Sequence, residues 1–205
     1  MSDIPSFSGK NICVFCGASP RVDPAYIDLA VRTGQAIAAR GYRLVYGGGG
    51  LGLMGAVSRG TDEAGGDVLG IIPKFLTELE QVVTDVPHVI VDSMHERKLQ
   101  MYDEADAFIT LPGGIGTLEE CVEVMSWARL KLHAKPIVFL SEDDFYAPMR
   151  ELLDHIVERG FAPSWMGEDL AFTSTIDGAF ALIEQAWTER AGRVVGQGAF
   201  GDADL

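Results

Sequence analysis

The sequence predicts an α/β protein in which a doubly wound, Rossmann-like parallel sheet is flanked by helices. Short apolar segments alternate with longer amphipathic segments along the chain, and most of the apolar segments are continuous runs. Continuous apolar runs are typical of strands that are covered on both faces. Alternation of such strands with helices implies right-handed βαβ crossovers, and this places the chain in the doubly wound class.

The strands and helices are predicted from the length and periodicity of each segment. The predicted strands span residues 11–16, 43–46, 67–72, 88–91, 107–111, 137–140 and 171–173. The predicted helices span residues 24–40, 53–64, 94–105, 118–132, 145–159 and 176–189. Residues 75–87 fit either a short helix or an active-site loop.

Two of these helices carry end signals. In 24–40, apolar residues such as Leu29 and Ile37 recur at helical spacing, and Gly41 is well placed to end the helix. Ser93 followed by Glu96 is typical of a capping box at the start of 94–105.

The chain length of 205 residues favours a single domain. We predict a flexible N-terminus at residues 1–9 and a nucleotide-binding catalytic domain at residues 10–190. Residues 191–205 combine Gly, Ala and Asp with few large apolar side chains, so we expect a disordered tail there.

Charge and cysteine content restrict the partners and the compartment. The net charge of -14 disfavours a nucleic acid polymer, although a helix start can still hold a small anion. The three cysteines form an odd set, the N-terminus is polar, and no apolar run approaches the length of a membrane span. We therefore expect a cytoplasmic protein without a membrane partner. Cys13 and Cys16 lie within an apolar strand and are expected to be buried thiols, and the histidines show no metal-ligand spacing.

Two glycine-rich turns directly follow predicted strands, and each leads into a helix. The first spans residues 47–55 and the second residues 112–117. A third strand end, residues 16–19, meets the same edge of the sheet, where α/β proteins bind their ligands. Glycine permits positive φ angles and lets a phosphate approach the backbone. One such turn would be explained as a tight turn, but two at this edge predict a phosphate site.

Two common nucleotide motifs are disfavoured. Gly50, Gly52 and Gly55 satisfy G-x-G-x-x-G, but they follow the second predicted strand, and the next strand lacks the acidic residue that a dinucleotide site needs. The sequence contains no G-x-x-x-x-G-K-[ST] motif, so a P-loop kinase or ATPase is disfavoured as well.

A carboxylate and two cations lie near the same edge. Thr117 can cap the helix after the second glycine turn, with Glu120 as its capping-box partner; alternatively, Glu120 lies beside whatever the bound phosphate carries. Arg97 and Lys98 lie near a helix start, where the helix dipole disfavours cations. A solvated charged face and a ligand-binding role are both compatible with that pair.

The motifs PGGIGTLEE at 112–120, SMHERK at 93–98 and the glycine cluster at 47–55 resemble those of the Lonely Guy (LOG) family. This family comprises cytokinin riboside 5'-monophosphate phosphoribohydrolases, some of which were long labelled lysine decarboxylases. The first motif matches P-G-G-x-G-T-x-x-E, and the resemblance covers about residues 10 to 190. Ile115 is a departure, since Tyr is common there in the family.

The resemblance implies a Rossmann-like fold, a homodimer or an assembly of dimers, and neither a metal nor a nicotinamide cofactor. The implied reaction converts an N6-modified adenosine 5'-monophosphate to the free base and ribose 5-phosphate, and plain AMP is often accepted. In the family, the residues that match Arg97 and Glu120 form the catalytic pair.

The predicted mechanism follows from the charge that develops when an N-glycosidic bond breaks. The ribose becomes positively charged, so a carboxylate near C1' stabilises it or activates water, and we assign this role to Glu120. Arg97 would orient the ribose or the phosphate, or assist the departing base. The predicted substrate-binding residues are Ser19, Gly48, Met94, Lys98, Gly113, Gly114, Gly116 and Thr117.

Two other functions compete with this prediction. A non-catalytic carrier of a nucleotide or phosphorylated cofactor would have the same fold and bind without releasing a base. Lysine decarboxylation commonly requires pyridoxal phosphate on a lysine, and none of the lysines has a context that marks it for that role.

Overall fold

The computed structural model describes residues 4, 6–77, 81, 86–163 and 170–195. The chain divides into two compact units, Met1–Lys135 and Pro136–Leu205.

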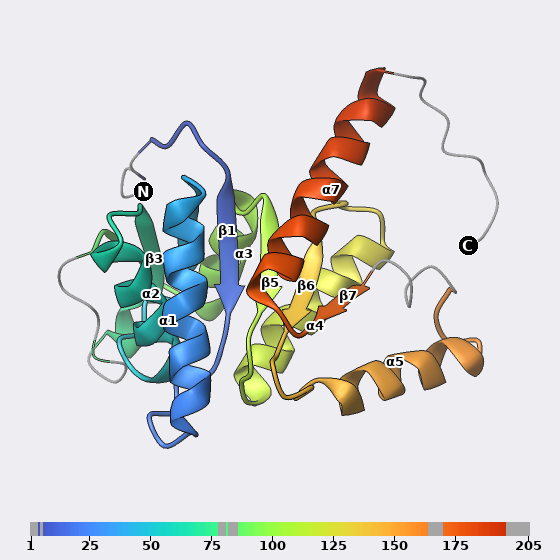
Figure 1. Ribbon diagram of the computed structural model, residues 1–205, viewed down its shortest axis with the longest axis horizontal. Coiled ribbons are helices and arrows are strands. Elements are labelled where there is room, and N and C mark those ends of the chain that lie inside the picture. The colour runs from blue at the N-terminus through green and yellow to red at the C-terminus, as the bar shows by residue number, and fades with distance from the viewer. Residues whose placement is uncertain (1–3, 5, 78–80, 82–85, 164–169, 196–205) are drawn as a thin grey trace. The chain divides into compact units, whose positions relative to one another are not determined.

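The first unit contains a parallel sheet whose strands lie in the order β4-β3-β2-β1-β5 (Figure 1). These strands are β1 (Asn11–Phe15), β2 (Arg43–Tyr46), β3 (Val68–Pro73), β4 (His88–Val91) and β5 (Ala107–Thr110). The helices are α1 (Pro24–Ala39), α2 (Gly52–Glu63), α3 (Met94–Glu104) and α4 (Ile115–Arg129), with a short 3-10 helix, η1 (Lys74–Leu76).

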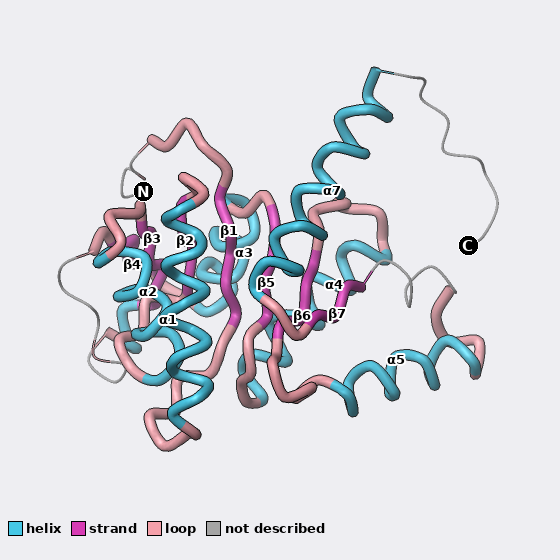
Figure 2. Tube along the Cα trace, viewed as in Figure 1, coloured by secondary structure: helices cyan, strands magenta, loops and turns pink. Residues whose placement is uncertain are grey.

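Helices cover both faces of this sheet, with α1 and α2 on one face and α3 and α4 on the other (Figures 1 and 2). Helices α1 and α2 approach closely because Gly34 lies against the carbonyl of Val57, and Gly60 lies against Val31. Every residue of β1, β2, β3 and β5 is buried, as continuous apolar strands should be. The predicted doubly wound α/β fold is confirmed.

The second unit pairs two parallel strands, β6 (Ile137–Leu140) and β7 (Leu170–Thr173), with register partners from Ile137↔Leu170 to Leu140↔Thr173. Helix α7 (Ile176–Val195) packs on both strands, and α5 (Ala147–Glu158) precedes β7. The rings of Phe139 and Phe172 stack between the two strands with centroids 4.7 Å apart.

Most element ends lie within one or two residues of the prediction, but three regions differ. Helix α4 begins at Ile115, not at residue 118, because Gly114 is its N-cap. Helix α7 continues to Val195, beyond the point where we expected the tail, and residues 196–205 lie outside the described residues. Of segment 75–87, the described part begins within η1, while 78–80 and 82–85 are also outside the described residues. The domain boundaries at 10 and 190 stay a prediction.

Within the described residues, no helix combines the length and the apolar character needed to cross a bilayer.

Candidate functional site

The three strand ends named in the sequence analysis meet in the first unit. The N–H of Gly17, after β1, donates to the carbonyl of Pro112 at 3.1 Å. The carbonyl of Gly17 accepts from the N–H of Leu53 in α2 at 2.9 Å. The end of β1 is therefore tied to both glycine turns. This edge lies at the point where the strand order reverses, which is the usual ligand position in such sheets.

The start of α4 lacks a side-chain cap. Its N-cap is Gly114, and the N–H of Leu118 is bonded to the Gly114 carbonyl at 3.0 Å. The preceding N–H groups of the first turn have no intrahelical acceptor. By contrast, α1 is capped by Asp23 and α3 by Ser93, whose hydroxyl accepts from the N–H of Glu96, while the Glu96 carboxylate accepts from the N–H of Asp92. The α4 start is thus available to an anion, whereas those of α1 and α3 are used internally.

Thr117 does not cap this helix, which corrects the capping prediction for Thr117 and Glu120. Thr117 lies in the first turn of α4, where it is buried, and a Cβ at Gly113 would overlap its side chain. Sequence reasoning placed the cap three residues too late, because a glycine N-cap leaves no side-chain signal.

Gly114 and Gly116 are exposed, and a Cβ built on either would meet no atom of the chain within 4 Å. Neither has the positive φ angle that would demand glycine. Packing within the described chain therefore accounts for Gly113 but leaves Gly114 and Gly116 unexplained. Open space over exposed backbone N–H groups is what a bound anion would require.

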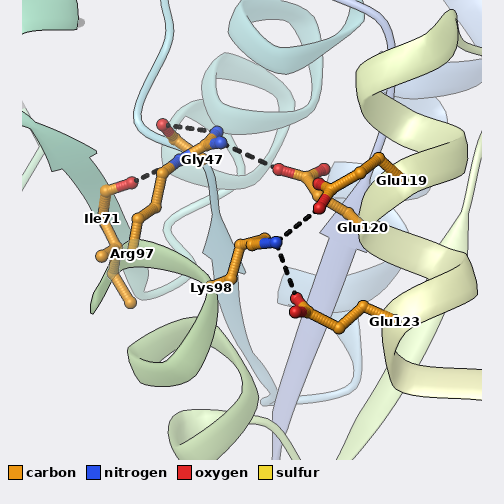
Figure 3. A network of polar contacts seen from close by, with 7 residues as sticks. All are labelled: Gly47, Ile71, Arg97, Lys98, Glu119, Glu120 and Glu123. Atoms are coloured by element: carbon orange, nitrogen blue, oxygen red, sulfur yellow. Dashed lines mark hydrogen bonds and ion pairs between the residues drawn. The ribbon is translucent and has the colours of Figure 1, made fainter. Parts of the chain in front are cut away.

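The structure brings the predicted catalytic residues into direct contact (Figure 3). The guanidinium of Arg97, from α3, donates to the Glu120 carboxylate of α4 at 2.8 Å. The two side chains are only 6% and 10% exposed. Arg97 also donates to the carbonyls of Ile71 at 3.2 Å and Gly47 at 3.1 Å. Arg97 is therefore fixed between the end of β2 and the backbone of β3, and it fixes Glu120 in turn.

Gly47 makes this arrangement possible. A Cβ at that position would overlap the Nη2 atom of Arg97, so a side chain on residue 47 would displace the guanidinium. The first residue of the first glycine turn is thus explained by Arg97.

Lys98 follows Arg97 and forms the second ion-pair group of Figure 3, with Glu119 and with Glu123 at 3.0 Å. Burial acts to lower the pKa of Lys98, but the hydrogen bonds and charges of the two glutamates outweigh it, so the pKa is raised. Lys98 therefore stays protonated at neutral pH. Glu119 and Glu123 of α4 both hold Lys98.

The other predicted binding residues lie around these groups. The backbone of Ser19 packs against Gly52 at the start of α2, while its exposed hydroxyl accepts from the N–H of Arg21 at 3.3 Å. Gly48 is buried with a φ of 80°. Met94 is the half-buried first residue of α3.

The cysteines are free and buried, as expected for Cys13 and Cys16. Burial, followed by the nearby Glu120 charge, raises the pKa of Cys13 and Cys16 well above the usual thiol value. The same two causes raise the pKa of Cys121 to about 12. These thiols remain protonated and are poor nucleophiles.

Sequence reasoning missed His88, which contacts the first glycine turn. Its Nε2 lies 3.2 Å from the carbonyl oxygen of Gly48 and 3.3 Å from the Tyr46 hydroxyl. The available signal was Gly70, since a glycine inside an apolar strand suggests that another group approaches closely.

These features define a Rossmann-like α/β protein with a buried arginine–glutamate pair at the carboxyl edge of its sheet. The family model described as "Possible lysine decarboxylase" matches residues 54–185. Together with the relatives below, this match shows that the chain belongs to the Lonely Guy (LOG) family.

The cytokinin riboside 5'-monophosphate phosphoribohydrolase LOG of Oryza sativa subsp. japonica is 47% identical over 153 residues, which are 74% of this chain and 63% of that protein. An Arabidopsis thaliana relative with the same activity name is 46% identical over 153 residues, covering 74% of this chain and 70% of that protein. A second rice relative is matched over 62% of its length, so the chain spans less than two thirds of each of these two rice proteins.

Solved structures show the same fold at low sequence identity. The molybdenum cofactor carrier protein of Chlamydomonas reinhardtii has a TM-score of 0.65 at 19% identity, covering 87% of this chain and 98% of that one. The molybdenum cofactor binding protein of Rippkaea orientalis has a TM-score of 0.65 at 23% identity, covering 88% and 98%.

Proposed function

We propose that this chain is a nucleoside 5'-monophosphate phosphoribohydrolase, an N-glycosyl hydrolase acting on N6-modified adenosine 5'-monophosphates and on AMP. Water adds to C1' of the ribose, the bond from C1' to the base breaks, and the base leaves with a proton. The products are the free base and ribose 5-phosphate. The buried contact between Arg97 and Glu120, beside the uncapped start of α4, is the observation that carries this proposal.

The phosphate is assigned to the backbone of the glycine turns. Gly113, Gly114, Gly116 and Thr117 would bind it at the start of α4, where N–H groups and the helix dipole favour an anion. Gly48 and Ser19 would contribute from the neighbouring strand ends, and Met94 from the start of α3. Lys98 would add positive charge to the site. Its ammonium group has three N–H donors, of which Glu119 and Glu123 take two, and the third would face the phosphate.

Glu120 is assigned to the reacting carbon. Its carboxylate would stabilise the positive charge that develops on the ribose or activate the attacking water. Arg97 keeps this carboxylate in place, and its guanidinium would also orient the ribose or phosphate or assist the departing base. Phosphate binding supplies orientation, so nucleosides without it should be poor substrates.

We further propose that the protein acts in the cytoplasm as a homodimer or an assembly of dimers. The three free cysteines support a reducing compartment. Exposed apolar side chains on α3 and α4, such as Leu99 and Val122, support association.

The test measures, by chromatography, the release of free base from AMP and from isopentenyladenosine monophosphate. The wild-type protein should release both bases. Glu120→Gln should lower the rate by about a hundredfold or more, as expected for loss of an acid–base or charge-stabilising group. Near-wild-type release by this variant would remove Glu120 from the mechanism.

The controls separate chemistry from folding. Glu120→Gln leaves Arg97 without its charge partner, so calorimetry must show that the variant still binds AMP. Glu63→Gln changes an exposed carboxylate on α2 and should leave the rate unchanged.

A carrier of a nucleotide or phosphorylated cofactor is the second candidate, favoured by the fold shared with molybdenum cofactor carrier proteins. Tight binding of AMP to the wild type without base release would support the carrier and contradict the hydrolase.

A further inference from the structure

The imidazole of His88 reaches across a strand to the turn that follows β2. Tyr46, Gly70 and His88 are register partners in one row across β2, β3 and β4. A Cβ at Gly70 would overlap the imidazole, so the glycine in the middle of the row lets the ring pass over β3. The Tyr46 and His88 rings meet edge to face with their centroids 6.2 Å apart.

The same ring faces two main-chain carbonyl oxygens. Nδ1 lies 2.8 Å from the oxygen of Val86, and Nε2 lies 3.2 Å from the oxygen of Gly48. A carbonyl oxygen only accepts hydrogen bonds, so bonding at both requires a proton on both ring nitrogens. The charged imidazolium satisfies the two carbonyls together.

Neutral His88 has a different set of partners. With its proton on Nδ1, the ring accepts through Nε2 from the Tyr46 hydroxyl, and the Gly48 carbonyl loses its donor. Burial raises the pKa of Tyr46 to about 12, so the phenol keeps its proton at neutral pH. The proton on Nε2 therefore decides whether His88 holds Gly48 or Tyr46.

We propose that protonated His88 is a positioning residue for the phosphate. It holds the Gly48 carbonyl, fixes the orientation of the peptide that follows β2, and so couples phosphate affinity to the uptake of one proton. The inference rests on the proposed function, because that function assigns the phosphate to this turn.

The polar and charged groups near the ring come from the residues before β4, from β2 and the turn after it, and from α2. Among the described residues, the groups facing His88 are the Tyr46 phenol and the carbonyls of Gly48 and Val86. From α2, the guanidinium of Arg59 donates to the Gly50 carbonyl of the same turn at 3.3 Å. A phosphate dianion brought to this turn favours the charged imidazole, and by linkage the charged imidazole favours the phosphate.

The experiment measures binding of ribose 5-phosphate to the full chain by calorimetry between about pH 5.5 and 8.5. The ligand is the proposed product and is not consumed. Its phosphate also titrates near pH 6, but that contribution is common to every variant. The difference between the curves therefore reports on residue 88 alone.

Four proteins are compared: wild type, His88→Gln, His88→Leu and Tyr46→Phe. The protein with protonated His88 should bind ribose 5-phosphate more tightly. The affinity of the wild type should therefore fall as pH rises, by about tenfold more than the affinity of His88→Leu falls. His88→Gln keeps a donor that does not titrate and should hold its affinity over the same range. Tyr46→Phe removes the partner of the neutral ring and should shift the wild-type curve to higher pH.

The outcomes are distinct. Parallel curves for wild type and His88→Leu overturn the inference; should His88→Leu not fold, a His88→Gln curve parallel to the wild type does so. Ribose 5-phosphate binding with the predicted curves but without base release from AMP contradicts the proposed function alone. No binding of ribose 5-phosphate contradicts both.

Discussion

At the scale of single residues, the glycines of the site fall into two groups. Gly47 and Gly113 leave room for atoms of the chain itself, the guanidinium of Arg97 and the side chain of Thr117. At Gly114 and Gly116, by contrast, no described atom of the chain occupies the space that a side chain would fill. Substitution by alanine should therefore have opposite consequences in the two groups.

Gly114→Ala should fold normally but bind ligand poorly. Its backbone is extended and its Cβ meets no neighbour, so the free energy of unfolding should change by less than about 0.5 kcal/mol. The new methyl group would occupy the space assigned to the phosphate. Calorimetry with ribose 5-phosphate and urea unfolding measure the two effects; unchanged affinity would place the phosphate elsewhere.

Gly47→Ala should show the reverse order of effects. The methyl group displaces the buried Arg97 guanidinium, and a broken buried ion pair typically costs about 3–5 kcal/mol of stability. Urea unfolding should show this loss, and turnover should fall with it because Glu120 loses its partner. Wild-type stability in this variant would show that the Arg97 side chain can adopt another conformation without loss of stability.

At the scale of elements, α3 and α4 carry two ion-pair groups on consecutive residues. Arg97 and Lys98 on α3 face Glu120 and the pair Glu119 and Glu123 on α4. The Arg97 group is buried and the Lys98 group is partly solvated, so the first should dominate the energy and the second should refine the alignment.

The double variant Glu119→Gln, Glu123→Gln tests the role of Lys98. Ion pairs that water can reach contribute little, and water reaches this group through Glu119, so the free energy of unfolding should fall by about 1 kcal/mol. The pKa of Lys98 should drop, because the two carboxylates that raise it are gone while the burial that lowers it remains. Lys98 is then free of its two carboxylates and can bind the phosphate more strongly, so KM for AMP should fall. A fall in kcat with unchanged KM would instead assign Lys98 to the alignment of α3 and α4.

Periodicity and turn chemistry were sufficient to predict these elements, because continuous apolar runs and capping residues are signals within short stretches of sequence. The motif positions likewise singled out Arg97 and Glu120. The start of α4 was misplaced, since Gly114 caps without a side chain. The row Tyr46–Gly70–His88 could not be predicted, because it depends on the register of three strands that are distant in sequence.

At the scale of the whole molecule, acidic charge and exposed apolar surface act against each other in self-association. The net charge of -14 opposes contact between copies. Yet α3, α4 and the turn after α4 expose Leu99 at 43%, Val122 at 47%, Leu130 at 58% and Leu132 at 65%. Burial of these half-exposed side chains against a second copy would remove them from water, and each would gain about half of the roughly 1.5–3 kcal/mol that a fully exposed side chain gains.

Leu130→Asp combined with Leu132→Asp should therefore convert the proposed dimer to monomers, because the new carboxylates would have to be desolvated when this surface is buried in the dimer interface. Light scattering on the eluting protein measures the mass directly. Ile90→Asp is the matched control, since Ile90 is 57% exposed but lies on the edge strand β4 and not on α3, α4 or the turn after α4. If Ile90→Asp dissociates the dimer and the leucine variant does not, the copies meet through the sheet edge and not through α4.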